Sequence, residues 1–170
     1  MLPPSSFFVD FEAFQHGEED FTIKELGIID AAKPMKQLYY LYLPPCDWDT
    51  LTHDQRRTYN YAYRALHKLS WDEGYMRFCT ECMRRDMDRY LFAATNRESS
   101  VFYVMGRQKT EFLRRLLPEY KFVNYQEAFA VASIRDLPEV AYGIRCLHRA
   151  HGDRCAVLKC YRMYQHFVSL

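Results

Sequence analysis

The N-terminal quarter of the chain alternates apolar and polar residues with the two-residue period of β-strands. The first segment is rich in phenylalanine, the second follows a polar turn and can pair with it as a hairpin, and the third ends at two prolines. The expected strands are residues 7–14, 21–29 and 37–43. Because side chains alternate along a strand, we expect the carboxylates of Asp10 and Glu12 to lie on the same face.

After the prolines the apolar spacing becomes helical, and helices and strands then alternate. Tyr59, Tyr63 and Leu66 recur at helical intervals behind a capping residue, Thr52 or Asp54. The expected helices are residues 52–69, 75–95, 110–117 and 156–168, and further strands are expected at 101–106 and 120–124. Hairpin-linked strands followed by this alternation predict an α/β or α+β domain with a mixed sheet.

Length and charge limit the organisation of the chain. With 170 residues, 49% of them hydrophobic, we expect one domain that spans residues 1–170. The 23 lysines and arginines nearly balance the 22 aspartates and glutamates, so no global field attracts nucleic acid. Any such binding must therefore come from a local basic surface.

The sequence has neither an apolar run of membrane-spanning length nor the basic, apolar start of a signal peptide. We therefore expect no membrane partner and an intracellular location, cytoplasmic or nuclear. In a reducing compartment the six cysteines are interpreted as thiols or metal ligands rather than as a disulfide framework.

A cluster near the C-terminus contains residue types that bind zinc. Cys146, His148 and Cys155 supply two thiolates and an imidazole at short spacing. This spacing is less specific than paired Cys-x-x-Cys knuckles, and by itself it leaves buried thiols beside a loop histidine equally open. A fourth ligand from elsewhere in the chain would decide between the two interpretations.

The sequence resembles the Maelstrom domain, a ribonuclease H-like fold with a Glu-Cys-His-Cys zinc set. Residues 23–27 (IKELG) look like the glutamate strand of that family, and residues 146–148 (CLH) with 155–158 (CAVL) look like its closing run. The resemblance implies an α/β fold with a mixed sheet flanked by helices, a structural Zn²⁺, and binding of single-stranded RNA or other nucleic acid in small-RNA or transposon-silencing biology. It also allows single-strand RNA cleavage. The ligands it implies are Glu25, Cys146, His148 and Cys155.

A second motif is similar to exonucleases of the DEDD type, which hold two Mg²⁺ or Mn²⁺ ions with an Asp-x-Glu on the first strand and aspartates on a middle and a last helix. Asp10 and Glu12 fit the first strand, and Asp153 with a nearby histidine fits the last motif. Two observations oppose this interpretation. The middle region, residues 107–117, offers only Glu111, and a zinc-bound His148 cannot also act as a base. His151 could replace it, and the alternative is a carboxylate pair without catalytic function.

Each of the other motifs has both a functional and a purely structural interpretation. Cys79 and Cys82 form a Cys-x-x-Cys pair in an expected helix, and we interpret them as two ordinary thiols rather than half of a zinc site. Tyrosines at 59–63 could stack on bases, although a core-facing helix accounts for at least half of them. Two basic sets at helical intervals could contact phosphates or simply be solvated: Arg84, Arg85 and Arg89, and Arg107, Lys109, Arg114 and Arg115.

Three functions follow from these motifs. The first is a zinc-stabilised domain that binds nucleic acid, RNA in particular. The second is an active exonuclease dependent on a divalent metal, with Asp10, Glu12 and Asp153 as its catalytic carboxylates. The third is a protein-interaction module that keeps the fold and has lost contact with nucleic acid.

Overall fold

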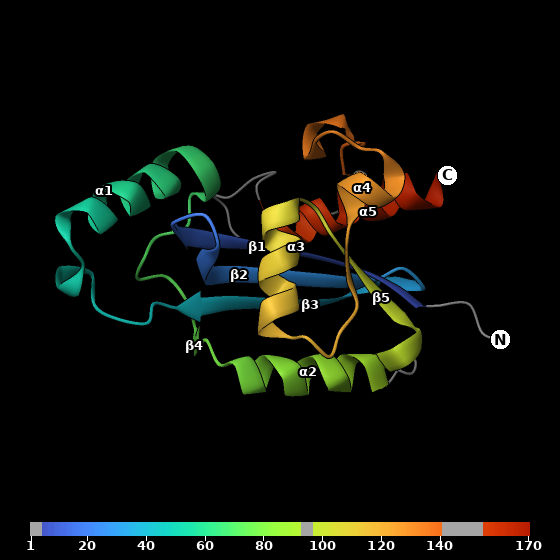
Figure 1. Cartoon of the computed structure of the whole chain (residues 1–170), viewed down its shortest axis with the longest axis horizontal. Helices are drawn as coiled ribbons and strands as arrows, with labels where there is room; N and C mark the ends of the chain where they lie inside the picture. The colour runs from blue at the N-terminus through green and yellow to red at the C-terminus, as the bar shows by residue number, and fades with distance from the viewer. Residues whose placement is uncertain (1–4, 93–96, 141–154) are drawn as a thin grey trace.

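The protein is built around one six-stranded mixed sheet (Figure 1). The computed structural model describes residues 5–92, 97–140 and 155–170. The strands are β1 (Ser5–His16), β2 (Asp20–Asp30), β3 (Lys33–Leu43), β4 (Met76–Arg77), β5 (Ser100–Val104) and β6 (Phe122–Asn124). Their order across the sheet is β4-β3-β2-β1-β5-β6. The first three strands form an antiparallel meander, and β4, β5 and β6 each pair in parallel with a neighbour.

Helices lie on both sides of this sheet, as expected for an α/β domain (Figure 1). They are α1 (His53–Tyr61), α2 (Thr80–Phe92), α3 (Arg107–Leu116), α4 (Tyr125–Phe129) and α5 (Ala156–Val168). Short helical turns occur at η1 (Trp48–Thr50), η2 (Ala62–His67), η3 (Arg97–Ser99) and η4 (Ile134–Asp136). In the described part of the chain, no helix is long and apolar enough to cross a membrane.

The alternation of β1 separates two apolar cores. Phe7, Val9 and Phe11 pack on one face with residues of α2 and α3. Phe8 packs on the opposite face with α5. Farther along that same face, Phe14 joins a smaller cluster with Tyr59 of α1 and Trp71. The residues between Phe8 and Phe14 on this face are Asp10 and Glu12, so a polar site lies between two apolar clusters.

Two expected helices differ from the structure. The segment expected as a helix over 75–95 begins instead as β4, which pairs with the end of β3, and α2 starts only at Thr80. The helix expected over 52–69 is α-helical to Tyr61 and continues through η2 as a π-helical turn that ends at Lys68 in the left-handed conformation. Thr52 caps α1 in a capping box with Gln55, as the sequence predicts for its start.

Candidate functional site

Asp10 and Glu12 lie side by side on the α5 face of β1, in agreement with the strand period. Asp10 is only 1% exposed and Glu12 is also buried. A buried carboxylate requires hydrogen bonds or a cationic partner, because burial removes the water that would otherwise solvate its charge. Two lysines, one on each of two helices, supply these partners.

Lys109 approaches this pair through a gap in the sheet. Strand β5 pairs with β1 only as far as Val9, opposite Val104, and among the described residues no other strand pairs with this edge of β1 beyond that point. The chain then turns at Gly106, whose φ of 101° is a conformation that favours glycine, and enters α3. From the first turn of α3, Lys109 Nζ donates to Asp10 Oδ1 at 2.8 Å and to the carbonyl oxygen of Phe11 at 2.6 Å.

Lys159 completes the cluster from α5. Its ammonium group donates to Glu12 Oε1, and Lys109 Nζ lies 4.0 Å from the same oxygen. The two carboxylates and two ammonium groups together carry no net charge. Asp10 Oδ2 is buried and accepts no hydrogen bond within the part of the chain that the structure describes.

The electrostatic environments of the two carboxylates differ. Burial raises the pKa of Asp10, and the nearby lysines only partly offset this effect. Burial also acts to raise the pKa of Glu12, but the charges of Lys109 and Lys159 outweigh it, so that pKa lies below its usual value. Burial lowers the pKa of Lys159, whereas Glu12 and Asp10 raise it more, and its net shift is upward. Both lysines therefore favour the charged form of Glu12, and Lys159 also donates a hydrogen bond to it.

Glu25 lies next to this cluster and holds the start of α5. It is opposite Glu12 in the β1–β2 ladder and is fully buried. Its Oε1 accepts a hydrogen bond from the backbone N–H of Ala156 at 2.6 Å, and its Oε2 accepts one from the Tyr39 hydroxyl at 2.9 Å. A carboxylate at a helix N-terminus is stabilised by the free N–H groups and by the helix dipole.

The close approach of α5 to the sheet depends on Gly27. A Cβ atom at this position would lie 2.8 Å from Val157 Cγ2 and 2.9 Å from the Val157 backbone nitrogen. The thiol of Cys160 also donates to the Gly27 carbonyl oxygen at 3.4 Å. The missing side chain of Gly27 thus lets α5 place Lys159 over Glu12.

The structure describes half of the predicted zinc set. Glu25 contacts the first residue of α5, and Cys155, the residue before it, is buried at the helix start. Cys146 and His148 lie outside the described residues, as does Asp153. Within residues 5–92, 97–140 and 155–170, no three histidine, cysteine or acidic side chains form a group that could hold a metal ion. The four-ligand set therefore remains a prediction.

The described residues around Asp10 and Glu12 supply no middle carboxylate of the kind that the exonuclease motif requires. Glu111, the acidic residue available in the middle region, pairs with Arg107 on the surface of α3 at 3.0 Å and does not join the cluster. Two ammonium groups contact the carboxylates that would bind the cations. Among the described residues, the donor set lacks the third carboxylate and carries compensating positive charge.

The sequence interpretation missed three residues of this site. The sequence indicates Lys109 only as part of a basic helix face, and it does not pair Lys159 with the carboxylates. The signal for Lys159 is a single charge within the apolar start of the last helix, residues 156–160 (AVLKC). The third is His67, which is buried in η2 with its ring 4.9 Å from that of Phe14.

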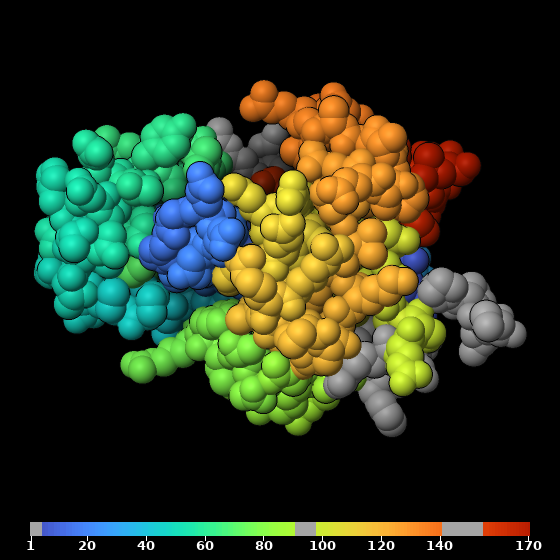
Figure 2. All heavy atoms as spheres, viewed as in Figure 1, coloured from blue at the N-terminus to red at the C-terminus, as the bar shows by residue number. Residues whose placement is uncertain are grey.

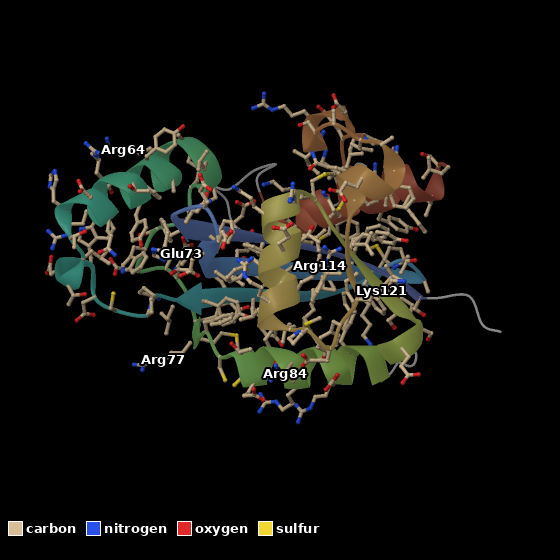
Figure 3. The ribbon with its side chains drawn as sticks, in the orientation of Figure 1. Arg64, Glu73, Arg77, Arg84, Arg114 and Lys121 are labelled. Atoms are coloured by element: carbon tan, nitrogen blue, oxygen red, sulfur yellow. The ribbon has the colours of Figure 1, made fainter. Side chains whose placement is uncertain are left out.

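The tyrosine segment lies more at the surface than expected, because only one of its three rings is in the core instead of at least half. Tyr59 is buried and stacks on Trp71, with ring centroids 5.0 Å apart and an interplanar angle of 9°. Tyr61 is 62% exposed and Tyr63 is 44% exposed. Arg64, between Tyr63 and the end of η2, points away from the body of the protein (Figure 3). The segment therefore exposes two aromatic rings and a cation to solvent, and the two rings lie on different sides of the helix because they are two residues apart.

Several arginines of the two basic sets have partners within the chain. Arg84 pairs with Glu81 and Glu119. Arg114 donates to the Phe122 carbonyl oxygen at 2.9 Å, and Arg115 donates to the Glu19 carbonyl oxygen. These contacts reduce the number of cations on α2 and α3 that could contact phosphates.

No protein-family model matches the sequence, and neither does any curated protein. Among solved structures, the fold is similar to that in "Crystal structure of exonuclease I in complex with inhibitor BCBP", with a TM-score of 0.53 and 11% sequence identity. The match covers 97% of this chain and 40% of that chain, so the protein spans two fifths of the exonuclease.

The chain has a ribonuclease H-like α/β fold, a mixed sheet flanked by helices. The sheet order and the flanking helices agree with this assignment, and so does the fold class expected from the sequence. At 11% identity the likeness concerns the fold alone. The Maelstrom resemblance within this fold class remains a prediction.

Proposed function

We propose that this protein is a nucleic-acid-binding domain that uses a nuclease-derived fold to hold single-stranded RNA. The observation that carries the proposal is the pair of exposed rings, Tyr61 and Tyr63, on a fold shared with an exonuclease. Exposed aromatic side chains provide stacking platforms for unpaired bases, and nearby cations attract the phosphates between them.

The α1–η2 surface has both components. Arg57, Arg64 and Lys68 are exposed on the segment that carries the two tyrosines. This segment forms one end of the molecule (Figures 1 and 2). Because its inner side is fixed by Tyr59 against Trp71, the outer rings are held on a rigid helix. A rigid platform reduces the ordering cost of binding.

A titration of a fluorescent single-stranded RNA tests the proposal. We expect wild-type protein to bind, and the double variant Tyr61→Ala/Tyr63→Ala to lose affinity by about 1–3 kcal/mol for each base that no longer stacks. Tyr75→Ala is a matched control, because Tyr75 is 59% exposed in the loop before β4. Equal affinity of the double variant and the control would contradict the proposal.

A structural zinc ion is the second element of the proposed function. Its ligands would be Glu25, Cys146, His148 and Cys155, as the Maelstrom resemblance implies, and the contact between Glu25 and the start of α5 supports the first and last of these. Zinc would fix the C-terminal helix to β2. We expect one zinc ion per chain by elemental analysis, and we expect Cys155→Ser to lose both the metal and stability, because metal binding contributes to folding. Metal-free wild-type protein that is fully folded would overturn this element.

Small-RNA or transposon silencing is the biological setting that the same resemblance suggests. It depends on RNA binding, so preference for RNA over DNA of identical sequence is its first requirement. The 2′-hydroxyl is the group by which a protein distinguishes the two.

An exonuclease dependent on Mg²⁺ or Mn²⁺ is the second candidate function. The observation that favours it is Asp10 Oδ2, a buried carboxylate oxygen that accepts no hydrogen bond from the described residues. Asp10, Glu12 and Asp153 would then bind the metal ions. We expect manganese-dependent degradation of a labelled oligonucleotide by the wild type and none by Asp10→Asn if this function is present; unchanged activity in the variant would reject it.

A further inference from the structure

Cys79 occupies the capping position of α2. Its carbonyl oxygen accepts the first helical hydrogen bond, from the backbone N–H of Met83 at 2.9 Å. Its Sγ accepts a hydrogen bond from the backbone N–H of Cys82 at 3.2 Å, as a serine or threonine oxygen does in a helix cap. The sulfur of Cys79 therefore lies at the positive end of the helix, where a thiolate is stabilised.

Cys82 lies on the first turn of the same helix and contacts the sulfur of Cys79. The hydrogen bond from its thiol is the main cause that lowers the pKa of Cys79, and the same contact raises the pKa of Cys82. Both side chains are partly exposed. The pair thus consists of a nucleophilic sulfur and an adjacent thiol that solvent can reach.

We propose that Cys79 and Cys82 form a redox-active pair that closes to an intramolecular disulfide when it meets hydrogen peroxide. The thiolate of Cys79 attacks the peroxide, so that an S–O bond forms, the O–O bond breaks and hydroxide leaves. The sulfur of Cys82 then attacks the resulting sulfenic acid, the S–S bond forms and water leaves with the Cys82 proton. Overall, two thiols lose two electrons and two protons, and the peroxide is reduced to two molecules of water.

The surroundings of the pair favour this chemistry over metal binding. Within the described ranges, no third histidine, cysteine or acidic side chain completes a metal-binding group at this position. Cys155 and Cys160 are buried, and burial raises the pKa of the Cys160 thiol well above its usual range. Among the described cysteines, Cys46 is exposed and serves as an internal reference for reactivity without a helix cap.

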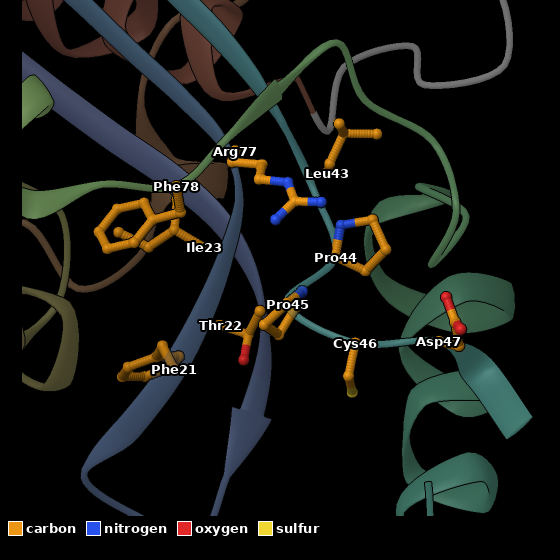
Figure 4. Close-up of a pocket in the computed structure, with 10 residues that line it drawn as sticks. All are labelled: Phe21, Thr22, Ile23, Leu43, Pro44, Pro45, Cys46, Asp47, Arg77 and Phe78. Atoms are coloured by element: carbon orange, nitrogen blue, oxygen red, sulfur yellow. The ribbon is translucent and has the colours of Figure 1, made fainter. Parts of the chain in front are cut away.

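The disulfide would lie at the edge of a cavity. Arg77 and Phe78, the two residues before Cys79, line a cavity of about 470 Å³ between β2, the end of β3 and β4 (Figure 4). The Phe78 ring also packs edge-on against Tyr42, with ring centroids 5.2 Å apart. Oxidation therefore constrains the junction between this cavity and α2.

Peptide mapping tests the proposal on the intact protein. The reduced protein is treated with a small excess of hydrogen peroxide near neutral pH, the remaining thiols are labelled with N-ethylmaleimide, and the protein is digested with trypsin. Because Arg77 and Arg84 bound the segment, a single peptide, residues 78–84, carries both cysteines. We expect this peptide to lose both labels and two hydrogen atoms, and to regain both labels after treatment with dithiothreitol.

Two serine variants identify the order of the steps. Cys82→Ser should stop at a sulfenic acid on Cys79, which dimedone traps, whereas Cys79→Ser should leave Cys82 as a labelled thiol. Serine is a good capping residue, so Cys79→Ser is expected to keep α2. Cys46 shows when an exposed thiol without a helix cap has been oxidised. If peptide 78–84 still carries two N-ethylmaleimide labels at that point, the proposal is overturned. The zinc content of the double variant Cys79→Ser/Cys82→Ser is compared with that of the wild type. A double variant that holds one zinc ion per chain fewer would also overturn the proposal, because the two sulfurs would then be metal ligands.

Discussion

Lys109 Nζ lies 2.8 Å from Oδ1 of Asp10, at the point where β5 stops pairing with β1. The same ammonium group binds the carbonyl oxygen of Phe11 on β1, beyond the last residue that pairs with β5. One lysine thus satisfies both a buried charge and a backbone acceptor. This contact balances the charge of Asp10. The stability of the buried carboxylate therefore depends on a cation that a different element, α3, supplies.

Replacement of Lys109 should reduce the stability of the folded protein. Lys109→Met leaves Asp10 buried without its cation, and we expect the free energy of unfolding to fall by about 3 kcal/mol. Urea denaturation at neutral pH measures this loss. The double variant Lys109→Met/Asp10→Asn should recover most of it, because the charge of Glu12, which remains buried, still pairs with that of Lys159. A single variant as stable as the wild type would show that the pair contributes little.

The ion pair of Glu12 predicts sensitivity to acid. Its pKa lies below the ordinary value of 4.5 in the folded protein, so the folded state binds this proton less tightly than the unfolded chain does. The stabilisation is present above that ordinary value and is lost as the pH falls through the lower folded pKa. Melting temperatures between pH 6 and pH 3 should therefore fall less steeply for Glu12→Gln than for the wild type. Parallel curves would contradict the assignment.

Gly27 is expected to tolerate no side chain. In Gly27→Ala the new Cβ would meet both the side chain and the backbone of Val157, and α5 would have to move. We expect a loss of about 1–3 kcal/mol in thermal or urea unfolding. Adding Val157→Ala should restore only part of the stability, since the backbone nitrogen of Val157 remains close. Complete restoration would mean that the side-chain contact alone is responsible.

Lys24 should anchor the loop that precedes β4. Its fully buried ammonium group donates to the carbonyl oxygens of Tyr42 at 2.7 Å and Trp71 at 2.8 Å, and also to that of Glu73. Lys24→Met removes these donors, and we expect a loss of about 2 kcal/mol and a red shift of tryptophan emission as Trp71 becomes solvated. The exposed Lys121→Met is the control (Figure 3). Unchanged emission would contradict an anchoring role.

The periodicity of apolar residues and the spacing of turns predicted the strand faces and the first hairpin. The period of two placed Asp10 and Glu12 on one face, and hairpin spacing predicted the pairing of β1 with β2. The error at residues 75–79 has a tertiary cause. The backbone N–H of Tyr75 bonds to the Leu41 carbonyl oxygen, and the following residues add a strand to β3. Sheet pairing here outweighs helical propensity.

The ionic cluster could not be predicted in the same way. Lys109 and Asp10 are 99 residues apart, and Lys159 and Glu12 are 147 residues apart. No periodicity within one segment indicates such a partner; only the closing of α3 and α5 over the same strand brings the charges together. The candidate carboxylates were therefore found from the sequence, and the lysines that determine their electrostatics were not.

Binding of single-stranded RNA by the wild-type protein, in buffer without added Mg²⁺ or Mn²⁺, tests the central claim most directly. We expect saturable binding that weakens as salt is raised, with the RNA intact at the end of the titration. Absence of binding even at low salt, or binding that appears only with added Mn²⁺ together with degradation of the RNA, would contradict it.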